Sequence, residues 1–373
     1  MKYSFVIPSY NNKKLLKNTL EALNNQTGYS SEDYEVLVVD DGSTDQTKEY
    51  IAGINTNYQL NYIYLNRDEN SCRSKTRNTG WRNAQGNIII FIDSDIIIMP
   101  NYLLELERVF ANNTKCLLIG NRLMLDKNSE NLSVSDILNT YQFDSTNYDL
   151  LEFRHFLYQA SSYNSNAIIC PWMQVYSCNL AVPKQYLIQV NGFDENFIKW
   201  GMEDIELGYS LYSIGLQIII NSRLEVLHQY HGKRNDLIVE LSKEKDYEEN
   251  IDYFLKKHPE AIKMRRNIAY KFFEGKLPTS LLLLGKPQTK KEITLKDIRD
   301  LNSYKKEIEA LAIQGDIAPV IYDYLEDTDI DIWIQSLGRT KNIIQYFPMS
   351  KEINTNKMKS FIDDERSRQL SEG

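Results

Sequence analysis

Cysteine and histidine are scarce in this sequence, with four of each among 373 residues. No CxxC pair occurs, which argues against a structural zinc site, so we interpret Cys72, Cys116, Cys170 and Cys178 as reduced thiols packed like small apolar residues. No apolar run approaches the roughly 18 residues that a membrane-spanning helix needs. The N-terminal run in MKYSFVIPSYNN is too short for a signal peptide. We therefore expect a soluble, cytoplasmic protein.

An excess of positive charge is also missing. The net charge of −8 argues against a partner that is a nucleic acid, because nucleic-acid-binding proteins usually carry a basic balance. Neither GxGxxG nor GxxxxGK[ST] is present, so a dinucleotide site and a P-loop lose their main support. A small anionic substrate stays possible, because cations can gather locally. Arg73, Lys75, Arg77 and Arg82 form such a run, although for Lys75 and Arg82 we favour a place on a solvated helix face.

Strands and helices are predicted to alternate over the first hundred residues. Buried strands are indicated by the apolar runs YSFVIPSY, YEVLVV, YIYLN and NIIIFIDSDIII. Helical spacing is found between them, at 12–26, 45–53 and 74–84. This order predicts an α/β fold with a mostly parallel central sheet.

The character of the chain changes near residue 236. Charged residues become dense there, and helices are predicted over 305–315 and 318–327. We expect residues 1–235 to form one domain and residues 236–373 to form a mainly helical C-terminal extension.

Three of the predicted strands end in polar clusters, namely Pro8-Ser9-Tyr10, Asp40-Asp41 and Asp93-Ser94-Asp95. The carboxyl ends of parallel strands meet at one edge of a sheet, so these clusters should lie together. Asp93 and Asp95 suit a divalent ion that also binds substrate phosphates, although a solvated turn explains them as well. Tyr10 offers a face for stacking and Asp41 an acceptor for a base N–H, but Asp-Gly turns are common.

The stretch WGMEDIELGYSLYSIG places Glu203, Asp204 and Glu206 just before an apolar helical pattern. The amino end of a helix favours ionised carboxylates, which is the form that a general base requires. Acids in a first helical turn also occur without any function, and we favour a structural role for Glu206. Further along, HQYHGKRND brings His228 and His231 close to a predicted strand. Spacing alone does not decide which of them completes a metal site.

Several motifs in order make a family resemblance specific. VIPSYNN, VVDDGSTD, TRNTGWRNAQG and FIDSD resemble family 2 glycosyltransferases with the GT-A fold. Residues 177–216 resemble an acceptor-side motif found in the galactosyltransferase C-terminal segment and in bacterial chondroitin-type polymerases, and HQYHGKRND resembles the metal-histidine segment that follows it. The resemblance covers about residues 1–235 and implies a nucleotide-sugar-binding fold.

The resemblance implies a role for each matching position. Substrate binding would fall to Pro8, Tyr10, Asp41, Arg77, Asp93, Ser94 and Trp200. Arg77 would lie near the ribose or diphosphate, and Trp200 would stack on a sugar. Asp95 and His228 would hold Mn²⁺ or Mg²⁺, with His231 as the alternative ligand. Asp204 would be the catalytic base, and Glu203 would hold sugar hydroxyls.

The implied reaction is an inverting, metal-dependent transfer of a hexose or N-acetylhexosamine from a UDP-sugar to a saccharide, lipid-linked or peptide acceptor, as in polysaccharide biosynthesis. A glycoside hydrolase would leave the uridine-type motifs and the DxD aspartates without a purpose. A non-catalytic sugar-nucleotide-binding scaffold that recruits partners through residues 236–373 stays an alternative. Residues 271–291 suit a peripheral membrane contact or a helix packed on its own domain. The oligomeric state stays open.

Overall fold

The computed structural model describes a defined part of the chain, namely residues 2–111, 113–141, 150–152, 154–232, 237–262, 271, 273, 282–283, 289–314, 317–325, 329–337 and 344–348. The chain forms two compact units, Met1–Glu152 with Trp172–Phe273, and Phe153–Pro171 with Glu274–Gly373. Most of the predicted membrane contact at 271–291 lies outside the described residues. Among those that are described, no helix is both long enough and apolar enough to cross a bilayer.

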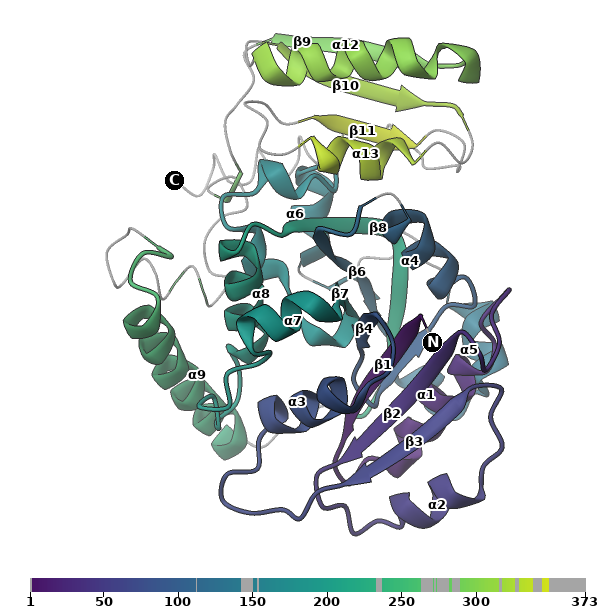
Figure 1. Ribbon diagram of the computed structural model, residues 1–373, viewed down its shortest axis with the longest axis vertical. Helices are drawn as coiled ribbons and strands as arrows, with labels where there is room; N and C mark the ends of the chain where they lie inside the picture. The colour runs from purple at the N-terminus through teal and green to yellow at the C-terminus, as the bar shows by residue number, and fades with distance from the viewer. Residues whose placement is uncertain are drawn as a thin grey trace. The chain divides into compact units, whose positions relative to one another are not determined.

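The first unit contains a large sheet and the helices around it (Figure 1). Its strands are β1 (Tyr3–Ser9), β2 (Tyr34–Asp40), β3 (Gln59–Tyr64), β4 (Ile88–Phe91), β5 (Ile96–Ile98), β6 (Cys116–Met124), β7 (Leu180–Pro183) and β8 (Gln217–His228). Its helices are α1 (Lys13–Leu23), α2 (Thr47–Gly53), α3 (Arg73–Asn83), α4 (Tyr102–Phe110), α5 (Val134–Thr140), α7 (Lys184–Val190), α8 (Glu203–Ser213) and α9 (Leu237–Lys257).

The strands of the first unit pair in the order β3-β2-β1-β4-β7-β6-β8-β5. The strands β3, β2, β1 and β4 run parallel, with Tyr3 of β1 opposite both Tyr34 and Ile88. β7 is antiparallel to β4 and β6, β8 is parallel to β6, and β5 is antiparallel to β8. The predicted α/β fold with a mostly parallel central sheet is confirmed.

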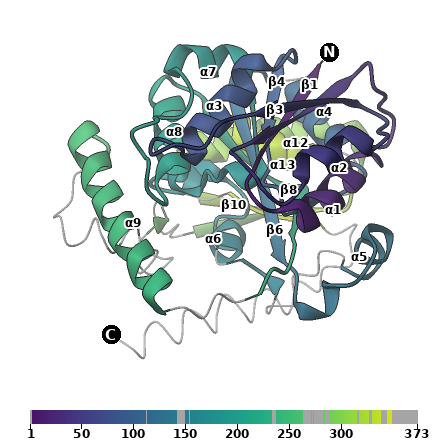
Figure 2. The same ribbon diagram turned by 90° about the horizontal axis from the view of Figure 1, so that it is seen from below.

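Helices cover both faces of the parallel part of the sheet, which explains why β1 and β2 are apolar throughout. On one face Tyr34 donates a hydrogen bond to the carbonyl of Leu23 in α1 (2.7 Å). Figure 2 shows α1 and α2 together on one side of β1–β3. On the other face Gly80 of α3 lies so close that an added Cβ would be 2.3 Å from Val6 and 3.2 Å from Val39. The missing side chain therefore lets α3 approach the sheet closely.

The single strand predicted over 87–98 is wrong, because this stretch forms two strands, β4 and β5, that lie in different parts of the sheet. The chain turns between them, and the Ile96 amide donates to the carbonyl of Asp93 (3.2 Å). A carboxylate is costly to bury inside a sheet. The turn leaves the Asp93 side chain about one-third exposed at the carboxyl edge of β4.

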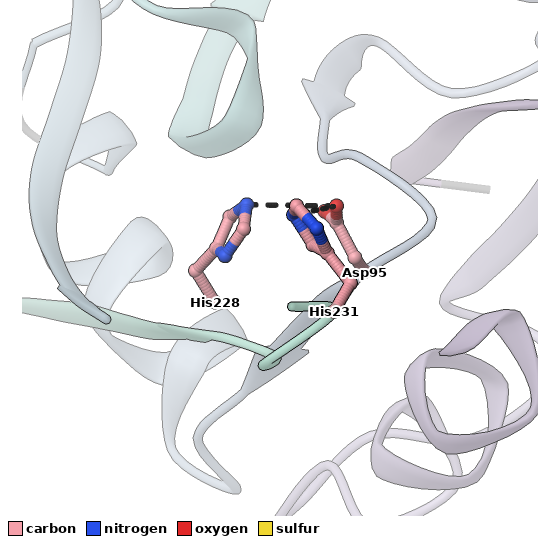
Figure 3. Close-up of side chains that lie close together, drawn as sticks. All are labelled: Asp95, His228 and His231. Carbon is pink, nitrogen blue, oxygen red and sulfur yellow. Dashed lines mark ion pairs between the residues drawn. The ribbon is translucent and has the colours of Figure 1, made fainter. Parts of the chain in front are cut away.

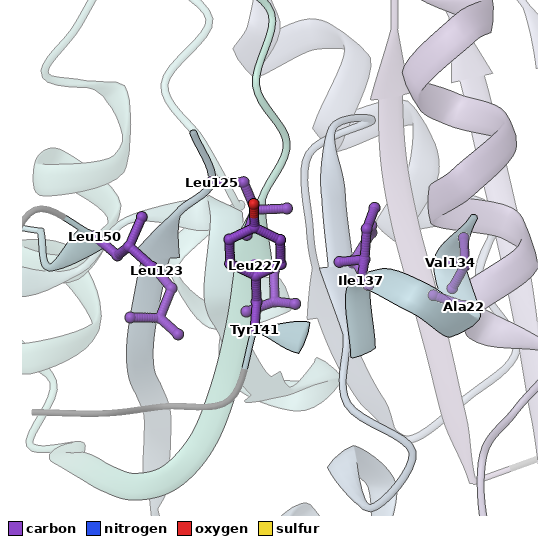
Figure 4. Packing of buried hydrophobic residues seen from close by; sticks show 9 residues of the cluster. Ala22, Leu123, Leu125, Val134, Ile137, Tyr141, Leu150 and Leu227 are labelled. Atoms are coloured by element: carbon purple, nitrogen blue, oxygen red, sulfur yellow. The ribbon is translucent and has the colours of Figure 1, made fainter. Parts of the chain in front are cut away.

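The far edge of the sheet is supported by its own apolar cluster (Figure 4). It is formed by Ala22, Ile97, Leu123, Leu125, Val134, Ile137, Tyr141, Leu150 and Leu227. These residues come from α1, β5, β6 and β8 and from α5 and the segments beside it. The cluster therefore fixes the β5–β8 pair, whose ends carry two of the predicted metal ligands.

Helix α9 belongs to the first unit, although it lies beyond the boundary predicted at residue 235. The Glu206 carboxylate, 1% exposed, accepts from Lys257 Nζ (2.8 Å) and lies 2.9 Å from His258 Nε2. The Asn250 side-chain amide donates to the Trp200 carbonyl (3.1 Å). Glu206 thus joins α8 to the end of α9, which confirms its predicted structural role.

The second unit combines helices with a small parallel sheet. Its elements include α6 (Arg154–Ala160), β9 (Thr289–Leu295), α12 (Leu301–Gln314), β10 (Ile317–Asp323), α13 (Ile330–Ser336) and β11 (Gln345–Pro348). The strands run parallel in the order β11-β10-β9. The helix predicted over 305–315 is confirmed by α12, whereas the helix predicted over 318–327 is wrong, because most of it forms β10. The run IAPVIYD is rich in β-branched and aromatic residues, which favour strands.

Candidate active site

Asp95, His228 and His231 form a cluster of metal-type ligands at the β5–β8 edge (Figure 3). Antiparallel pairing puts Ile96 opposite His228, so the side chain before β5 meets the one that ends β8. Asp95 Oδ2 lies 3.5 Å from His228 Nε2 and 3.9 Å from His231 Nε2. One ligand atom from each of the three residues falls within 4.8 Å of the others. The two histidines differ in exposure, at 14% for His228 and 48% for His231.

Burial shifts the pKa values of Asp95 and His228 in opposite directions. Burial raises the pKa of Asp95 to about 7, and the neighbouring Asp93 carboxylate adds to this effect. Its Oδ1 atom is buried without a hydrogen-bond partner among the described residues. Burial lowers the pKa of His228 to about 4, and the nearby Arg122 adds to this effect. His228 is therefore neutral at physiological pH, which is the state that binds metals.

The predicted base pocket gathers at the carboxyl ends of β1 and β2. Pro8 pairs in register with the end of β2, and the Tyr10 ring beyond it is 47% exposed. Arg67 places its guanidinium 3.9 Å from the centre of this ring and forms an ion pair with Asp41. Burial raises the pKa of Asp41, although Arg67 opposes the shift. The sequence analysis did not identify Arg67 as a site residue. The sequence does show that it is a cation in the loop after the third predicted strand, and this position could have indicated it.

The Asp93–Asp95 loop is anchored at the same edge of the sheet. Ser94 Oγ accepts from the Asn12 side chain (2.8 Å), and its carbonyl accepts from Thr19 Oγ1 (3.0 Å). The Asp41 amide donates to the Ser9 carbonyl at the end of β1 (2.9 Å). The prediction that the three strand ends lie together is therefore confirmed.

Arg77 links this edge to the start of α8. The side chain lies on α3 and is only 3% exposed. Its NH2 lies 3.2 Å from Asp93 Oδ1, whereas its NH1 lies 3.1 Å from Glu203 Oε1 and 3.4 Å from Asp204 Oδ1. One buried cation is thus shared by three carboxylates that come from two distant segments.

Asp204 lies in the first turn of α8 with its carboxylate one-fifth exposed. Its Oδ2 accepts from the Ser177 amide (3.1 Å). Burial raises the pKa of Asp204 to about 6, while Arg77 lowers it and the carboxylates of Glu203 and Asp93 raise it. The group is ionised at neutral pH yet has a pKa close to it, which suits general-base chemistry.

An aromatic pair lies just before α8. The Trp200 ring is 41% exposed, and its centre lies 5.7 Å from that of Tyr247 in α9. Between Trp200 and α8, Gly201 has a φ of +90°, and an added Cβ would be 2.6 Å from the Tyr247 ring. Sequence reasoning missed Tyr247, because the predicted boundary assigned α9 to another domain.

The remaining cations of α3 face solvent, as expected. Arg82 is 44% exposed and pairs with Glu195 (3.2 Å), and Lys75 pairs with Asp68 (3.4 Å).

Two family models match the chain. The model described as glycosyl transferase family 2 matches residues 4–181, and the model described as N-terminal domain of galactosyltransferase matches residues 159–232. Validoxylamine A glucosyltransferase of Streptomyces hygroscopicus subsp. limoneus is 27% identical over 266 residues, which are 69% of this chain and 56% of that protein. Chondroitin synthase of Escherichia coli is 30% identical over 252 residues, which are 62% of this chain and 35% of that protein. The chain thus spans about a third to a little over half of the length of these relatives.

Solved structures share the fold at low sequence identity. TarS 1–349 of S. aureus in complex with UDP-GlcNAc has a TM-score of 0.51 and 16% identity, over 73% of this chain and 70% of that one. The mannosyltransferase PcManGT of Pyrobaculum calidifontis in complex with GDP-Man and Mn²⁺ has a TM-score of 0.51 and 16% identity, over 76% of this chain and 72% of that one.

Proposed function

We propose that the protein transfers a hexose or N-acetylhexosamine from a UDP-sugar to a saccharide, lipid-linked or peptide acceptor. The proposal starts from the match of residues 4–181 to the model of glycosyl transferase family 2 and from the GT-A fold that the chain shares with the solved structures. The observation that carries the proposal is the link from Asp204 through Arg77 to Asp93. This link brings a candidate base beside the loop that ends in Asp95, and therefore beside the metal-type cluster.

The donor pocket of the proposal uses the strand-end residues. Pro8 lines the uridine site, Tyr10 stacks on the base and Asp41 accepts its N–H, while Asp93 and Ser94 lie toward the ribose and sugar. Because Arg67 contacts both Tyr10 and Asp41, a bound base has to share these groups with it or displace it. UDP as the carrier is supported by the structural neighbour in complex with UDP-GlcNAc, although another neighbour holds GDP-Man.

The residues at the β5–β8 edge fit a divalent cation. Asp95 contributes a buried oxygen that lacks a hydrogen-bond partner within the described part of the chain, and His228 contributes a neutral imidazole, with His231 beside it. Mixed oxygen and nitrogen ligands suit Mn²⁺ better than Mg²⁺, which prefers oxygen ligands. When bound, such an ion would offset the charge that develops on the departing diphosphate.

In the proposed reaction the acceptor hydroxyl gives its proton to Asp204 while its oxygen forms a bond to the anomeric carbon. The bond from this carbon to the diphosphate oxygen breaks, and its electron pair leaves with UDP. A single displacement of this kind inverts the anomeric centre and needs one base, not a second carboxylate as nucleophile. Glu203 is proposed to hold a sugar hydroxyl, and Trp200 offers its exposed ring to a sugar face.

The proposal is tested with a panel of UDP-glucose, UDP-galactose, UDP-GlcNAc, UDP-GalNAc and GDP-mannose, titrated with Mn²⁺ and with chelator. Slow UDP release is then measured for the preferred donor. Asp204→Asn should keep donor binding and lower release by about 10²-fold or more, the usual contribution of a general base. Asp136→Asn is the matched control, because Asp136 is also an acid in a first helical turn but is exposed on α5.

The outcomes distinguish a glycosyltransferase from a non-catalytic sugar-nucleotide-binding scaffold. Metal-dependent binding of one UDP-sugar, with release that Asp204→Asn abolishes, supports the transferase. No nucleotide binding with any cation overturns it. Donor binding without turnover on any acceptor favours the non-catalytic scaffold.

A further inference from the structure

The guanidinium of Arg77 is already occupied by carboxylates. It is 3% exposed, and both terminal nitrogens lie within 3.4 Å of carboxylate oxygens of Asp93, Glu203 and Asp204. Its plane also lies against the Phe193 ring, whose centre is 5.4 Å from Cζ. Each terminal nitrogen donates one hydrogen bond, NH1 to Glu203 and NH2 to Asp93, whereas Nε is buried without a hydrogen-bond partner among the described residues. Because the guanidinium is a rigid fork, these two bonds set its orientation. The Arg77 guanidinium therefore points toward carboxylates of the protein itself.

The charge of this cluster also disfavours a diphosphate at Arg77. One positive charge faces three carboxylates, so the four side chains are net negative when all are ionised. A phosphate that approached Arg77 would meet uncompensated acids, which repel it in a buried site. The helix that carries Arg77 is also packed closely on the sheet. Gly80, one helical turn further on, lets α3 approach β1 and β2. The base of the Arg77 side chain is therefore fixed with α3 close to the sheet.

We propose that Arg77 is a positioning residue for the base Asp204, which it keeps oriented and ionised while tying it to Asp93, and that it does not bind the donor diphosphate. This inference rests on the proposed function of Asp204. The resemblance by itself implied a contact of Arg77 with the ribose or diphosphate, so the geometry assigns a different role. The Ser177 amide donates to Oδ2 of Asp204, whereas Oδ1 lies 3.4 Å from Arg77 NH1 in an ion pair and has no hydrogen-bond partner among the described residues. The amide and the guanidinium thus act on opposite oxygens of the carboxylate.

The surroundings of Asp204 show what the loss of Arg77 would do. The groups that face Asp204 are Arg77 from α3, Asp93 from the β4–β5 turn, Glu203 from its own helix and the Ser177 amide. Burial and the two acids favour the protonated carboxyl, whereas Arg77 and the amide favour the ionised form. Removing Arg77 leaves the ionised base opposed by burial and by the like charges of Glu203 and Asp93. Asp204 would then stay protonated into the neutral range and could not accept a proton there.

The decisive experiment follows the titration of Asp204 in the full chain. Protein labelled with ¹³C at the aspartate carboxyls is titrated by NMR, and Asp204→Asn identifies the Asp204 signal. In Arg77→Gln the midpoint of this signal should rise by about 1–3 pH units, the usual effect of an adjacent opposite charge. Arg77→Lys keeps the charge and should stay closer to the wild type. Arg82→Gln is the matched control on the same helix, where the cation is exposed, and it should leave the midpoint unchanged.

Two further readouts distinguish positioning from donor binding. Calorimetry with UDP and Mn²⁺ should give the same affinity for Arg77→Gln as for the wild type. The kcat for the preferred donor should fall at neutral pH and recover as the pH rises, with little change in KM. If UDP affinity falls while the Asp204 midpoint stays fixed, Arg77 binds the diphosphate and the inference is wrong.

A second variant tests the role of Arg77 if Arg77→Gln folds poorly, and the titration also works on a protein without activity. Arg77→Gln with Glu203→Gln removes one positive and one negative charge together, so the cluster keeps its net charge, and the midpoint should still rise. The carboxyl titration needs no sugar donor. It therefore decides the role of Arg77 even if no UDP-sugar is turned over, an outcome that would overturn the proposed function alone.

Discussion

Glu206 and Glu249 offer a matched pair of substitutions at the junction of α8 and α9. Each carboxylate accepts a hydrogen bond from a lysine on the other side of this junction. Glu206 is 1% exposed, whereas Glu249 is 46% exposed. We expect Glu206→Gln to destabilise the first unit clearly and Glu249→Gln to have little effect, because water screens exposed ion pairs.

The magnitude follows from what Glu206 touches. It accepts from Lys257 and Ser210 and lies 2.9 Å from His258 Nε2. Losing the charged hydrogen bonds of a buried carboxylate costs about 1.5–3 kcal/mol. The larger cost of orphaning a fully buried partner does not apply, because Lys257 is 34% exposed and also pairs with Asp194 (2.6 Å).

The effect should also depend on pH with a defined sign. Burial alone would raise the pKa of Glu206, but the bonds from His258 and Lys257 outweigh it and hold this pKa below its ordinary value. A carboxyl whose pKa is lower in the folded state stabilises the fold above its unfolded pKa, and the contribution is lost as pH falls through the folded pKa. The difference between wild type and Glu206→Gln should therefore be full at neutral pH and shrink in acid below the unfolded pKa of roughly 4.3.

The assay is urea unfolding followed by tryptophan fluorescence at several pH values. Trp172 is 2% exposed and stacks on Phe254 of α9, so its emission reports the packing of this helix. Equal losses for Glu206→Gln and Glu249→Gln, or a loss for Glu206→Gln that grows in acid, would refute the reasoning.

Two further predictions concern the metal-type cluster and α3. His228→Ala should weaken the Mn²⁺ dependence of UDP binding more than His231→Ala does, because His228 is less exposed and lies closer to Asp95. A metal titration in which His231→Ala has the larger effect would reject this ligand assignment. Gly80→Ala should lower the free energy of unfolding by about 1–3 kcal/mol through overpacking against Val6. Gly53→Ala in α2 is its control, since an added Cβ there meets nothing within 4 Å, and equal thermal shifts for the two variants would contradict the packing argument.

The parallel core of the first unit could be predicted because its signals are local. Apolar runs define β1 and β2, and each ends in a polar residue where the strand ends. Adjacent parallel pairing then brings Tyr10 and Asp41 to one edge without any knowledge of distant segments. The GT-A fold expected from the resemblance is likewise confirmed by the solved structures.

The rest depended on partners far away in the sequence. Apolar residues run on both sides of Asp93 and Asp95, so residues 87–98 look like one strand until β8 pairs with the second half. Asp93 and Glu203, which contact Arg77, lie 16 and 126 residues after it in the sequence. No local sequence pattern predicts such a cluster. The strand β10 is a short apolar run, which periodicity alone does not distinguish from a helix.

The position of β8 between β6 and β5 has a consequence for synthesis of the protein. Translation makes Asp95 early, but its strand β5 pairs only with β8 among the described strands, and His228 is the last residue of β8. A nascent chain that stops short of β8 already contains Tyr10 and Asp41 but neither of the clustered histidines. Without β8, the strand β5 has no described strand to pair with, and β6 is left as the open edge of the sheet. The metal-type cluster and the attachment of β5 to the sheet therefore depend on the same strand, β8.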